Sequence, residues 1–260
     1  MLSEITILPG TDKLDVMENF TEITLRAGET ISIVGPTGSG KTAFITDIEL
    51  LAQGDTATGR TILINGTPPI DDIRYSPSLK PITMITQNTK CFADLTAEEF
   101  LKIHTRARGK NDNGIISETI KLANSFTGEK IHKDAKVTIL SGGQTRSLLI
   151  ADAIMIGAAP IILLDEIENA GIFKQEVINI IKDTGKIIIF VTHDPLIALL
   201  TKKRIIIENG AVKKVLYQNE VEIKAAQNLL EIERRVGTIR EQLRAGDVIT
   251  DDVLAVNFAS

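Results

Sequence analysis

The feature that most constrains the fold is the segment Gly35-Pro36-Thr37-Gly38-Ser39-Gly40-Lys41-Thr42, which matches the pattern G-x-x-x-x-G-K-[ST]. A short β-branched run, Ile31 to Val34, leads into its first glycine, and a helical pattern from Thr42 to Ala52 follows. Glycines let successive backbone N–H groups turn inward to form an anion site, and the start of a helix adds its positive dipole end. The segment therefore predicts a phosphate-binding loop between a strand and a helix.

Two side chains of this loop carry specific chemistry. We expect Lys41 to reach the β- and γ-phosphates of a nucleotide and the Thr42 hydroxyl to bind Mg²⁺. A glycine-rich turn that binds nothing is the alternative, but such a turn has no structural need of a lysine and a hydroxyl at these two offsets.

An apolar run from Ile161 to Leu164 ends in two acids, Asp165 and Glu166. Isolated buried charge is costly, so a buried strand rarely ends in paired carboxylates without a cation nearby. We expect Asp165 to hold Mg²⁺ and Glu166 to orient or deprotonate an attacking water. A solvated strand end is the alternative, which the phosphate loop upstream disfavours.

Apolar runs that alternate with helical patterns predict the fold class. Ile161 to Leu164 and Ile187 to Val191 are fully apolar, and a helical pattern around 174–182 separates them. This arrangement is typical of an α/β fold with a parallel sheet covered on both faces. The length of 260 residues suits one large domain, or one domain with a small appendage.

Composition excludes several classes of protein. The net charge of −5 does not imply a strongly basic face, so we expect no nucleic-acid partner. The long apolar stretch from Leu148 to Leu164 is not expected to span a membrane, because Asp152, Gly157 and Pro160 interrupt it. The single cysteine, Cys91, permits no internal disulfide and favours a reducing compartment.

The segment 221–260 is expected to be a helical C-terminal extension. Its apolar residues recur every three or four positions, at Ala225, Leu229, Ile232, Val236, Ile239 and Leu243. This is an a/d stripe, which Gly237 interrupts at a cost of about 1 kcal/mol relative to alanine. The stripe packs either on the protein's own surface or on a dimer or other partner.

Three further motifs complete a family pattern. Leu140-Ser141-Gly142-Gly143-Gln144 lies upstream of Asp165 and resembles the signature sequence of the ATP-binding cassette (ABC) ATPases. Gln87 lies between the phosphate loop and this signature, and His193 follows the strand that ends at Val191. Both resemble residues that the family uses. The five motifs occur in family order over roughly residues 1–215.

The resemblance implies an architecture and a reaction. The fold would be a P-loop NTPase core with a parallel sheet, a small antiparallel β subdomain and a helical signature subdomain at about 90–145. This ABC ATPase domain would span 1–220. Its reaction would be Mg²⁺-dependent hydrolysis of ATP to ADP and phosphate by two cassettes closed head to tail, as a homo- or heterodimer.

The resemblance also assigns roles to the residues. Ser141, Gly142, Gly143 and Gln144 of one subunit would bind the nucleotide held by the other subunit's phosphate loop. Gln87 would bring Mg²⁺ and the attacking water into contact with a segment that senses a partner. His193 would hydrogen-bond the γ-phosphate beside the catalytic Glu166.

Two departures from the family pattern bear on function. The stretch Pro9-Gly10-Thr11-Asp12-Lys13 carries no aromatic residue to stack on adenine, and the nearest, Phe20, resembles a core residue. After Glu166 the chain lacks the proline and the Leu-Asp of transporters, which leaves Glu168 and Asn169 as substitutes for the missing aspartate. We expect the nucleotide-binding subunit that powers a transporter, cytoplasmic and peripheral at the inner face of the membrane through a transmembrane partner. The alternative is a soluble ABC ATPase that assembles, activates or remodels a client protein complex.

Overall fold

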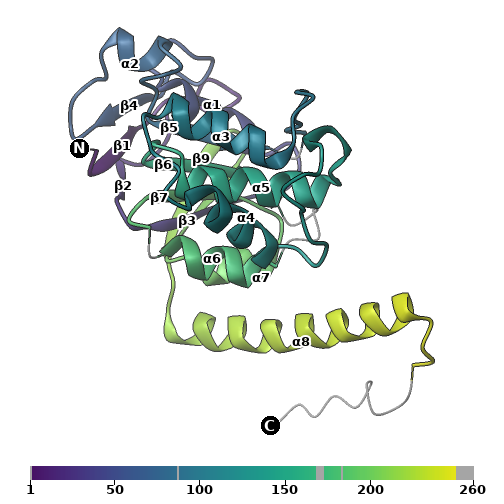
Figure 1. Cartoon of the computed structure of the whole chain (residues 1–260). Coiled ribbons are helices and arrows are strands. Elements are labelled where there is room, and N and C mark those ends of the chain that lie inside the picture. Colours follow the sequence, from purple (N-terminus) through teal and green to yellow (C-terminus); the bar gives the residue numbers. More distant parts are fainter. Residues whose placement is uncertain (1, 87, 168–172, 183, 250–260) are drawn as a thin grey trace. The chain divides into compact units, whose positions relative to one another are not determined.

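The computed structural model describes residues 2–86, 88–167, 173–182 and 184–249. By its internal contacts the chain divides into two compact units, Met1–Tyr217 and a second unit that begins at Gln218. Each unit is described separately below (Figure 1).

A six-stranded sheet forms the centre of the first unit and confirms the predicted parallel sheet. Its strands, in order across the sheet, are β5 (Ile82–Ile85), β6 (Ile161–Asp165), β7 (Ile187–Val191), β3 (Thr30–Val34), β8 (Lys203–Glu208) and β9 (Ala211–Tyr217). All neighbours are parallel except β8 and β9, which form an antiparallel hairpin. The carboxyl ends of β3, β6 and β7 therefore meet at one edge of the sheet.

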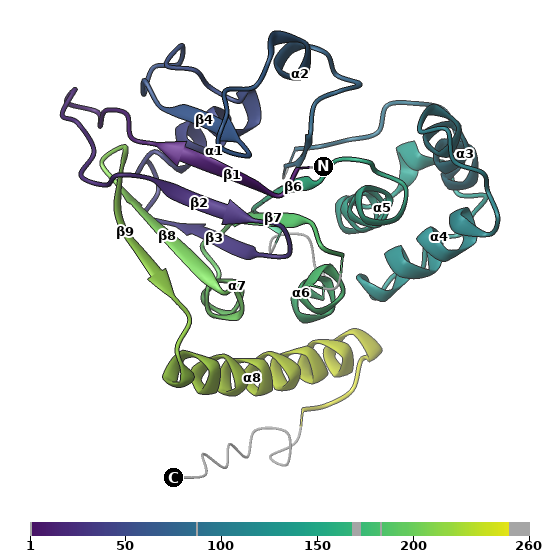
Figure 2. The same ribbon diagram turned by 90° about the vertical axis from the view of Figure 1, so that its left-hand side faces the viewer.

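One face of this sheet is covered by α1 (Lys41–Leu50) and by a small antiparallel sheet. The strand order in the small sheet is β2 (Ile23–Arg26), β1 (Glu4–Leu8) and β4 (Thr61–Ile64). The short helix α2 (Asp71–Tyr75) connects β4 to β5. Figure 2 shows α1 and the small sheet on the same side of the parallel strands.

Helices cover the opposite face (Figure 2). They are α3 (Ala97–Ala107), α4 (Ile115–Ser125), α5 (Gly142–Met155), α6 (Lys174–Lys182) and α7 (Pro195–Leu200), with a 3₁₀ turn at Val137–Ile139. Thr96 caps α3 through a reciprocal pair of hydrogen bonds with Glu99, which explains why the helix begins there.

The side-chain alternation of the strands explains the two-sided core. Ile162 and Leu164 belong to the cluster under the helices, whereas Ile161 and Leu163 belong to the cluster under α1 and the small sheet. Successive side chains of a strand point to opposite faces, so only a fully apolar strand can serve both clusters. This is the physical reason that these strands read as continuous apolar runs.

The second unit holds α8 (Glu220–Ala245), which confirms the predicted helix over most of the extension. The Asn219 side chain caps its start, and Gly246 ends it with a left-handed backbone conformation. Gly237 lies within the helix without breaking it. No helix among the described residues is long and apolar enough to cross a membrane.

Candidate functional site: a phosphate loop beside two carboxylates

The phosphate loop connects β3 to α1, as the sequence predicts. Gly38 and Gly40 have φ of +76° and +105°, in the left-handed region that glycine adopts without strain. A Cβ at Gly35 would lie 2.3 Å from the Ile207 carbonyl oxygen, and one at Gly40 would lie 2.7 Å from the Gly210 Cα. The first and last glycines of the motif therefore allow the loop to pack against the β8–β9 hairpin.

The Lys41 side chain contacts the start of this loop. Its Nζ donates to the carbonyls of Gly35 at 2.8 Å and Pro36 at 3.1 Å, and the residue is only 8% exposed. Burial lowers the pKa of Lys41, while the nearby carboxylates of Glu166 and Asp165 oppose this shift. Residues about 125 positions apart in the chain thus lie close enough to interact electrostatically.

The two carboxylates lie at the carboxyl end of β6, next to β7. Asp165 pairs with Val191 in the sheet, and the Glu166 amide donates to the Val191 carbonyl at 2.9 Å. Glu166 adopts φ of +50°, a conformation that is uncommon for residues other than glycine and that occurs most often at functional sites. Its Oε1 lies 3.4 Å from Nε2 of His193.

His193 is held in place by the start of α7. The Thr192 amide donates to Ile33 of β3, and the Asp194 side chain caps α7 by accepting from the amides of Leu196 and Ile197. The backbone on both sides of His193 is therefore fixed. The structure brings Lys41, Asp165, Glu166 and His193 together at the carboxyl edge of the sheet, beside the loop that ends at Thr42.

The signature segment forms the start of α5. Ser141 accepts from the Gln144 amide at 3.3 Å and donates its own amide to the Gln144 side chain at 2.9 Å, a reciprocal cap. Gln144 also donates to the Lys130 carbonyl. Ser141 and Gly142 remain exposed, whereas Gly143 is partly covered. The start of α5, which carries the positive end of the helix dipole, is thus presented on the surface.

Some predicted residues lie outside the described part of the chain. These are Gln87, Glu168 and Asn169. Next to Gln87 in the chain, the Thr86 amide donates to the Thr89 hydroxyl at 2.8 Å. Thr89 lines a pocket of about 170 Å³ between β5, α3 and α5.

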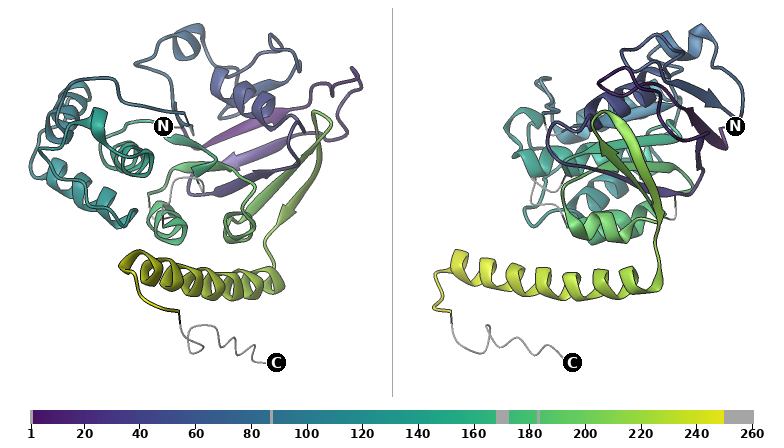
Figure 3. Two further views of the ribbon diagram at one scale, coloured as in Figure 1. Left: turned by 90° about the vertical axis from the view of Figure 1, so that its right-hand side faces the viewer. Right: turned by 180° about the vertical axis from the view of Figure 1, so that it is seen from behind.

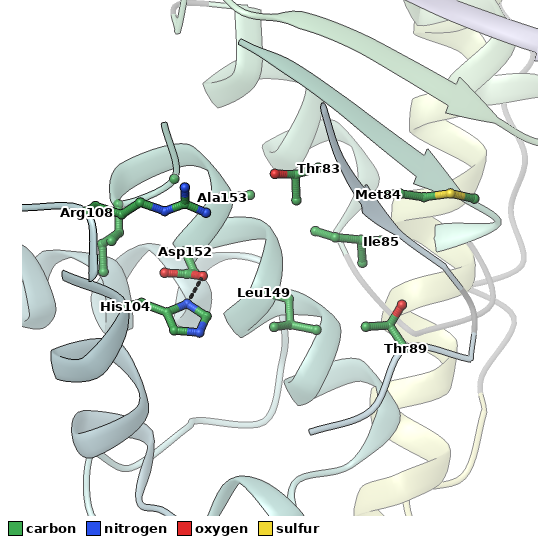
Figure 4. A pocket seen from close by; sticks show the side chains of 11 residues that line it. Thr83, Met84, Ile85, Thr89, His104, Arg108, Leu149, Asp152 and Ala153 are labelled. Atoms are coloured by element: carbon green, nitrogen blue, oxygen red, sulfur yellow. Dashed lines mark hydrogen bonds and ion pairs between the residues drawn. The ribbon is translucent and has the colours of Figure 1, made fainter. Parts of the chain in front are cut away.

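This pocket holds an acid–imidazole pair that the motifs did not reveal (Figure 4). Asp152, only 8% exposed, places its Oδ2 2.7 Å from Nδ1 of His104. Arg108 and Leu149 also line the pocket. The two partners are 48 positions apart and lie on different helices, so no local pattern links them.

Sequence reasoning also missed the contacts that hold the loop from Gly10 to Glu18. The Lys13 ammonium donates to the Gly38 carbonyl of the phosphate loop. Arg60 binds both Glu18 and Asp47 inside the protein, where all three side chains are at most 2% exposed. A charged residue in a turn is ordinary in a sequence, so no local pattern indicated these contacts.

The donor chemistry of the site fits Mg²⁺. Thr42 is exposed in the first turn of α1. Asp165 is the last residue of β6 and interacts electrostatically with Lys41, which precedes Thr42 in the chain. Hydroxyl and carboxylate oxygens are the ligands that Mg²⁺ takes in nucleotide sites, where water and phosphate complete the coordination.

Comparison with known proteins identifies the family. A family model described as "ABC transporter" matches residues 19–169. An uncharacterized ABC transporter ATP-binding protein of Methanocaldococcus jannaschii is 44% identical over 255 residues, which is 98% of each chain. A thiamine import ATP-binding protein of Brucella suis is 29% identical over 202 residues, 74% of this chain and 79% of its own.

Solved structures support the same fold. A dimeric ATP-binding cassette in a post-hydrolysis state with ADP and phosphate superposes with a TM-score of 0.61 at 23% identity, covering 83% of this chain and 99% of its own. The cbiO1 protein of Clostridium perfringens gives a TM-score of 0.63 at 20% identity, covering 93% and 100%. The chain therefore belongs to the ABC transporter family of ATP-binding proteins, and it is an ATPase.

Proposed function

We propose that this ATPase is the nucleotide-hydrolysing subunit of a membrane transporter and that it works as a head-to-tail dimer. The observation that carries the proposal is the arrangement at the carboxyl edge of the sheet, where Lys41 lies within the field of Asp165 and Glu166 and Glu166 pairs with His193. This is the arrangement that hydrolysis of a phosphoanhydride requires, because positioning and electrostatics supply most of the catalysis.

Within one subunit the roles follow from charge and position. Backbone amides of Gly38 to Lys41 and the Lys41 ammonium neutralise the phosphates. Glu166 is the general base and takes a proton from the attacking water. As it does so, the water oxygen bonds to the γ-phosphorus, and the bond from the γ-phosphorus to the oxygen that bridges to the β-phosphate breaks. His193 orients the carboxylate and donates toward the γ-phosphate.

Mg²⁺, when bound, neutralises charge on the β- and γ-phosphates. Thr42 and Asp165 would hold it, and Gln87 would complete the set from the loop after β5. The proposal thus retains the three metal-binding residues expected from the sequence.

The second half of each catalytic site comes from the partner subunit. The Ser141 hydroxyl and the amides of Gly142 and Gly143, at the start of α5, suit the γ-phosphate of the opposite nucleotide, and the reciprocal cap between Ser141 and Gln144 holds this turn in shape. Dimers among the structural neighbours support a paired arrangement.

The pocket beside Thr89 is the proposed contact with the transmembrane partner. It is lined by β5, by α3 and by α5, whose first turn carries the signature. A helix of the partner seated there would touch Thr89, two residues from Gln87, and Leu149 of the signature helix. Movement of the partner would then change both halves of the nucleotide site. This role places the chain at the cytoplasmic face of the membrane.

Glu166→Gln tests the catalytic assignment. The variant should bind Mg-ATP with near wild-type affinity, lose at least about a thousandfold in hydrolysis rate, and accumulate as a dimer in light scattering. Glu118→Gln changes an exposed carboxylate on α4 and should behave as wild type. Hydrolysis at the wild-type rate by Glu166→Gln would remove Glu166 from the base role.

The same variant tests the physiological role. With Mg-ATP it should co-purify with a polytopic membrane protein from the membrane fraction, and Leu149→Arg, which fills the pocket, should abolish that association while ATP binding persists. Recovery of a soluble complex instead would replace transport with the assembly or remodelling of a client protein.

A further inference from the structure

The helix α8 carries an apolar stripe that is largely open to solvent. Both views of Figure 3 show α8, in yellow-green, as one continuous helix. Ile232 is 43% exposed, Val236 is 39% exposed and Leu243 is 60% exposed. Side chains three and four positions apart share one face of a helix, so these residues lie along a single line. An exposed line of aliphatic groups of this length is typical of a helix that pairs with another helix.

The heptad positions of α8 follow from this stripe. We call the α8 seam the five residues at its a and d positions, which are Leu229, Ile232, Val236, Ile239 and Leu243. Gly237 falls at position b, on the outer side of the helix, where a Cβ would have no atom within 4 Å. The glycine therefore does not interrupt the seam.

Charged residues flank the seam on both sides. Glu233 and Arg240 occupy the e positions and are exposed, and Arg235 occupies a g position. The Nε of Arg235 donates to Glu231 of the same helix at 3.1 Å. Charges at e and g set the orientation and register in which two helices pair.

These charges disfavour a parallel pair of α8 helices. In a parallel coiled coil, a g residue of one helix faces the e residue of the following heptad in the other. Arg235 would then face Arg240 of a second copy, and symmetry would repeat this contact on the opposite side. Two like-charge contacts beside a seam of only five residues would oppose the pairing.

An antiparallel pair has the opposite outcome. When its midpoint lies between Gly237 and Thr238, Val236 packs against Ile239 of the second copy, and Glu233 meets Arg240 of the second copy. Symmetry makes each contact twice. A pair centred on Arg234 would instead place Glu233 beside Glu233 and Arg235 beside Arg235. Charge complementarity therefore favours one orientation and one register.

We infer that α8 binds α8 of a second copy of this chain as an antiparallel two-stranded coiled coil. The contact is isologous, so it closes after two subunits. The two helices overlap only from Leu229 to Gly246, so the contact alone is modest. It involves no nucleotide and goes beyond the proposed function. By holding two cassettes together, it raises the effective concentration at which their nucleotide sites meet.

Sedimentation of the full chain in EDTA without nucleotide tests this inference. Wild type should form dimers. Glu233→Arg should weaken dimerisation by about tenfold or more, because two attractions become two repulsions. Glu233→Arg/Arg240→Glu exchanges the charges and should restore the wild-type dimer. The control, Arg234→Glu, reverses an exposed charge at the outer position f and should sediment as wild type.

The distance between two spin labels tests the orientation. A label at Lys224→Cys, in a Cys91→Ser background, lies near the start of α8. In the antiparallel pair the two labels should be about 40 Å apart, from a rise of about 1.5 Å per residue. A parallel pair would bring them to about 10 Å, the usual separation of helix axes.

Four results would overturn the inference: a wild-type monomer in EDTA, a dimer that Glu233→Arg leaves intact, a charge exchange that fails to restore it, or labels about 10 Å apart. The proposed head-to-tail dimer has a separate test. Glu233→Arg/Glu166→Gln should still dimerise when Mg-ATP is added, because that dimer forms through the nucleotide sites. Failure of this variant to dimerise with Mg-ATP, while wild type dimerises in EDTA, would count against the cassette dimer and leave the α8 pair in place.

Discussion

Replacement of Arg60 by methionine should destabilise the protein strongly. Arg60 binds Glu18 in a bidentate pair, with Nη2 to Oε1 at 2.7 Å and Nε to Oε2 at 2.8 Å, and Asp47 through Nη1 at 2.9 Å. Its Nη2 also donates to the Gly210 carbonyl at 2.6 Å. Burial acts against the charge, but the carboxylates of Glu18 and Asp47 outweigh it and raise the pKa of Arg60.

The magnitude follows from what the substitution leaves behind. Methionine fills much of the volume, but Glu18 is then a buried carboxylate without its cation, although it still accepts from the amides of Gly10 and Val212. Removing one partner of a buried ion pair costs about 4 kcal/mol. The orphaned Gly210 carbonyl adds about 1 kcal/mol. Asp47 keeps the hydroxyls of Thr56 and Thr58, so the total is about 5 kcal/mol, within the range for a broken buried pair.

Urea unfolding at pH 7, followed by far-UV circular dichroism, measures this loss of stability. Arg26→Met is the matched control, because its 3.4 Å pair with Glu4 is exposed and should contribute less than about 0.5 kcal/mol. A loss below about 1 kcal/mol for Arg60→Met at pH 7 would refute this reasoning.

Three further outcomes are expected. Gly40 has φ of +105°, and a Cβ there would lie only 2.7 Å from the Gly210 Cα. Gly40→Ala should therefore lower the free energy of unfolding in urea by about 2 kcal/mol and weaken the affinity for ATP in calorimetric titration. Burial, aided by nearby positive charge, lowers the pKa of Lys186 to about 8. Since the unfolded lysine titrates near 10.4, this group makes stability rise with pH between about 8 and 10.4, and Lys186→Met should remove that rise from denaturation curves. Ser141→Ala should lose the α5 cap, costing about 1 kcal/mol in urea unfolding.

Much of the secondary structure could be predicted from the sequence. The strands Ile161–Asp165 and Ile187–Val191 and the helix Lys174–Lys182 lie where the apolar patterns placed them. Helix α5 begins earlier than its apolar pattern at Leu148, because the capping pair at its start is formed by polar residues of the signature. Patterns of this kind depend only on residues that are close together in the chain, so they can be recognised without knowledge of the tertiary structure.

The phosphate loop and the acidic strand end were likewise predictable, because their glycines, lysine and carboxylates stand at offsets that one chemistry requires. The apposition of Lys41 with Asp165 and Glu166 follows from parallel strand order, which places carboxyl ends at a common edge. The sequence by itself determined these features.

Tertiary structure alone decided the remaining contacts. Arg60 meets Glu18 at a separation of 42 residues, His104 meets Asp152 at 48, and Lys13 meets Gly38 at 25. Each partner lies in a turn or on a helix where its residue type is ordinary, and nothing local indicates that it is paired. A long-range polar contact depends on how whole elements pack, because burial in the assembled core is what makes an unpaired charge costly and its partner necessary.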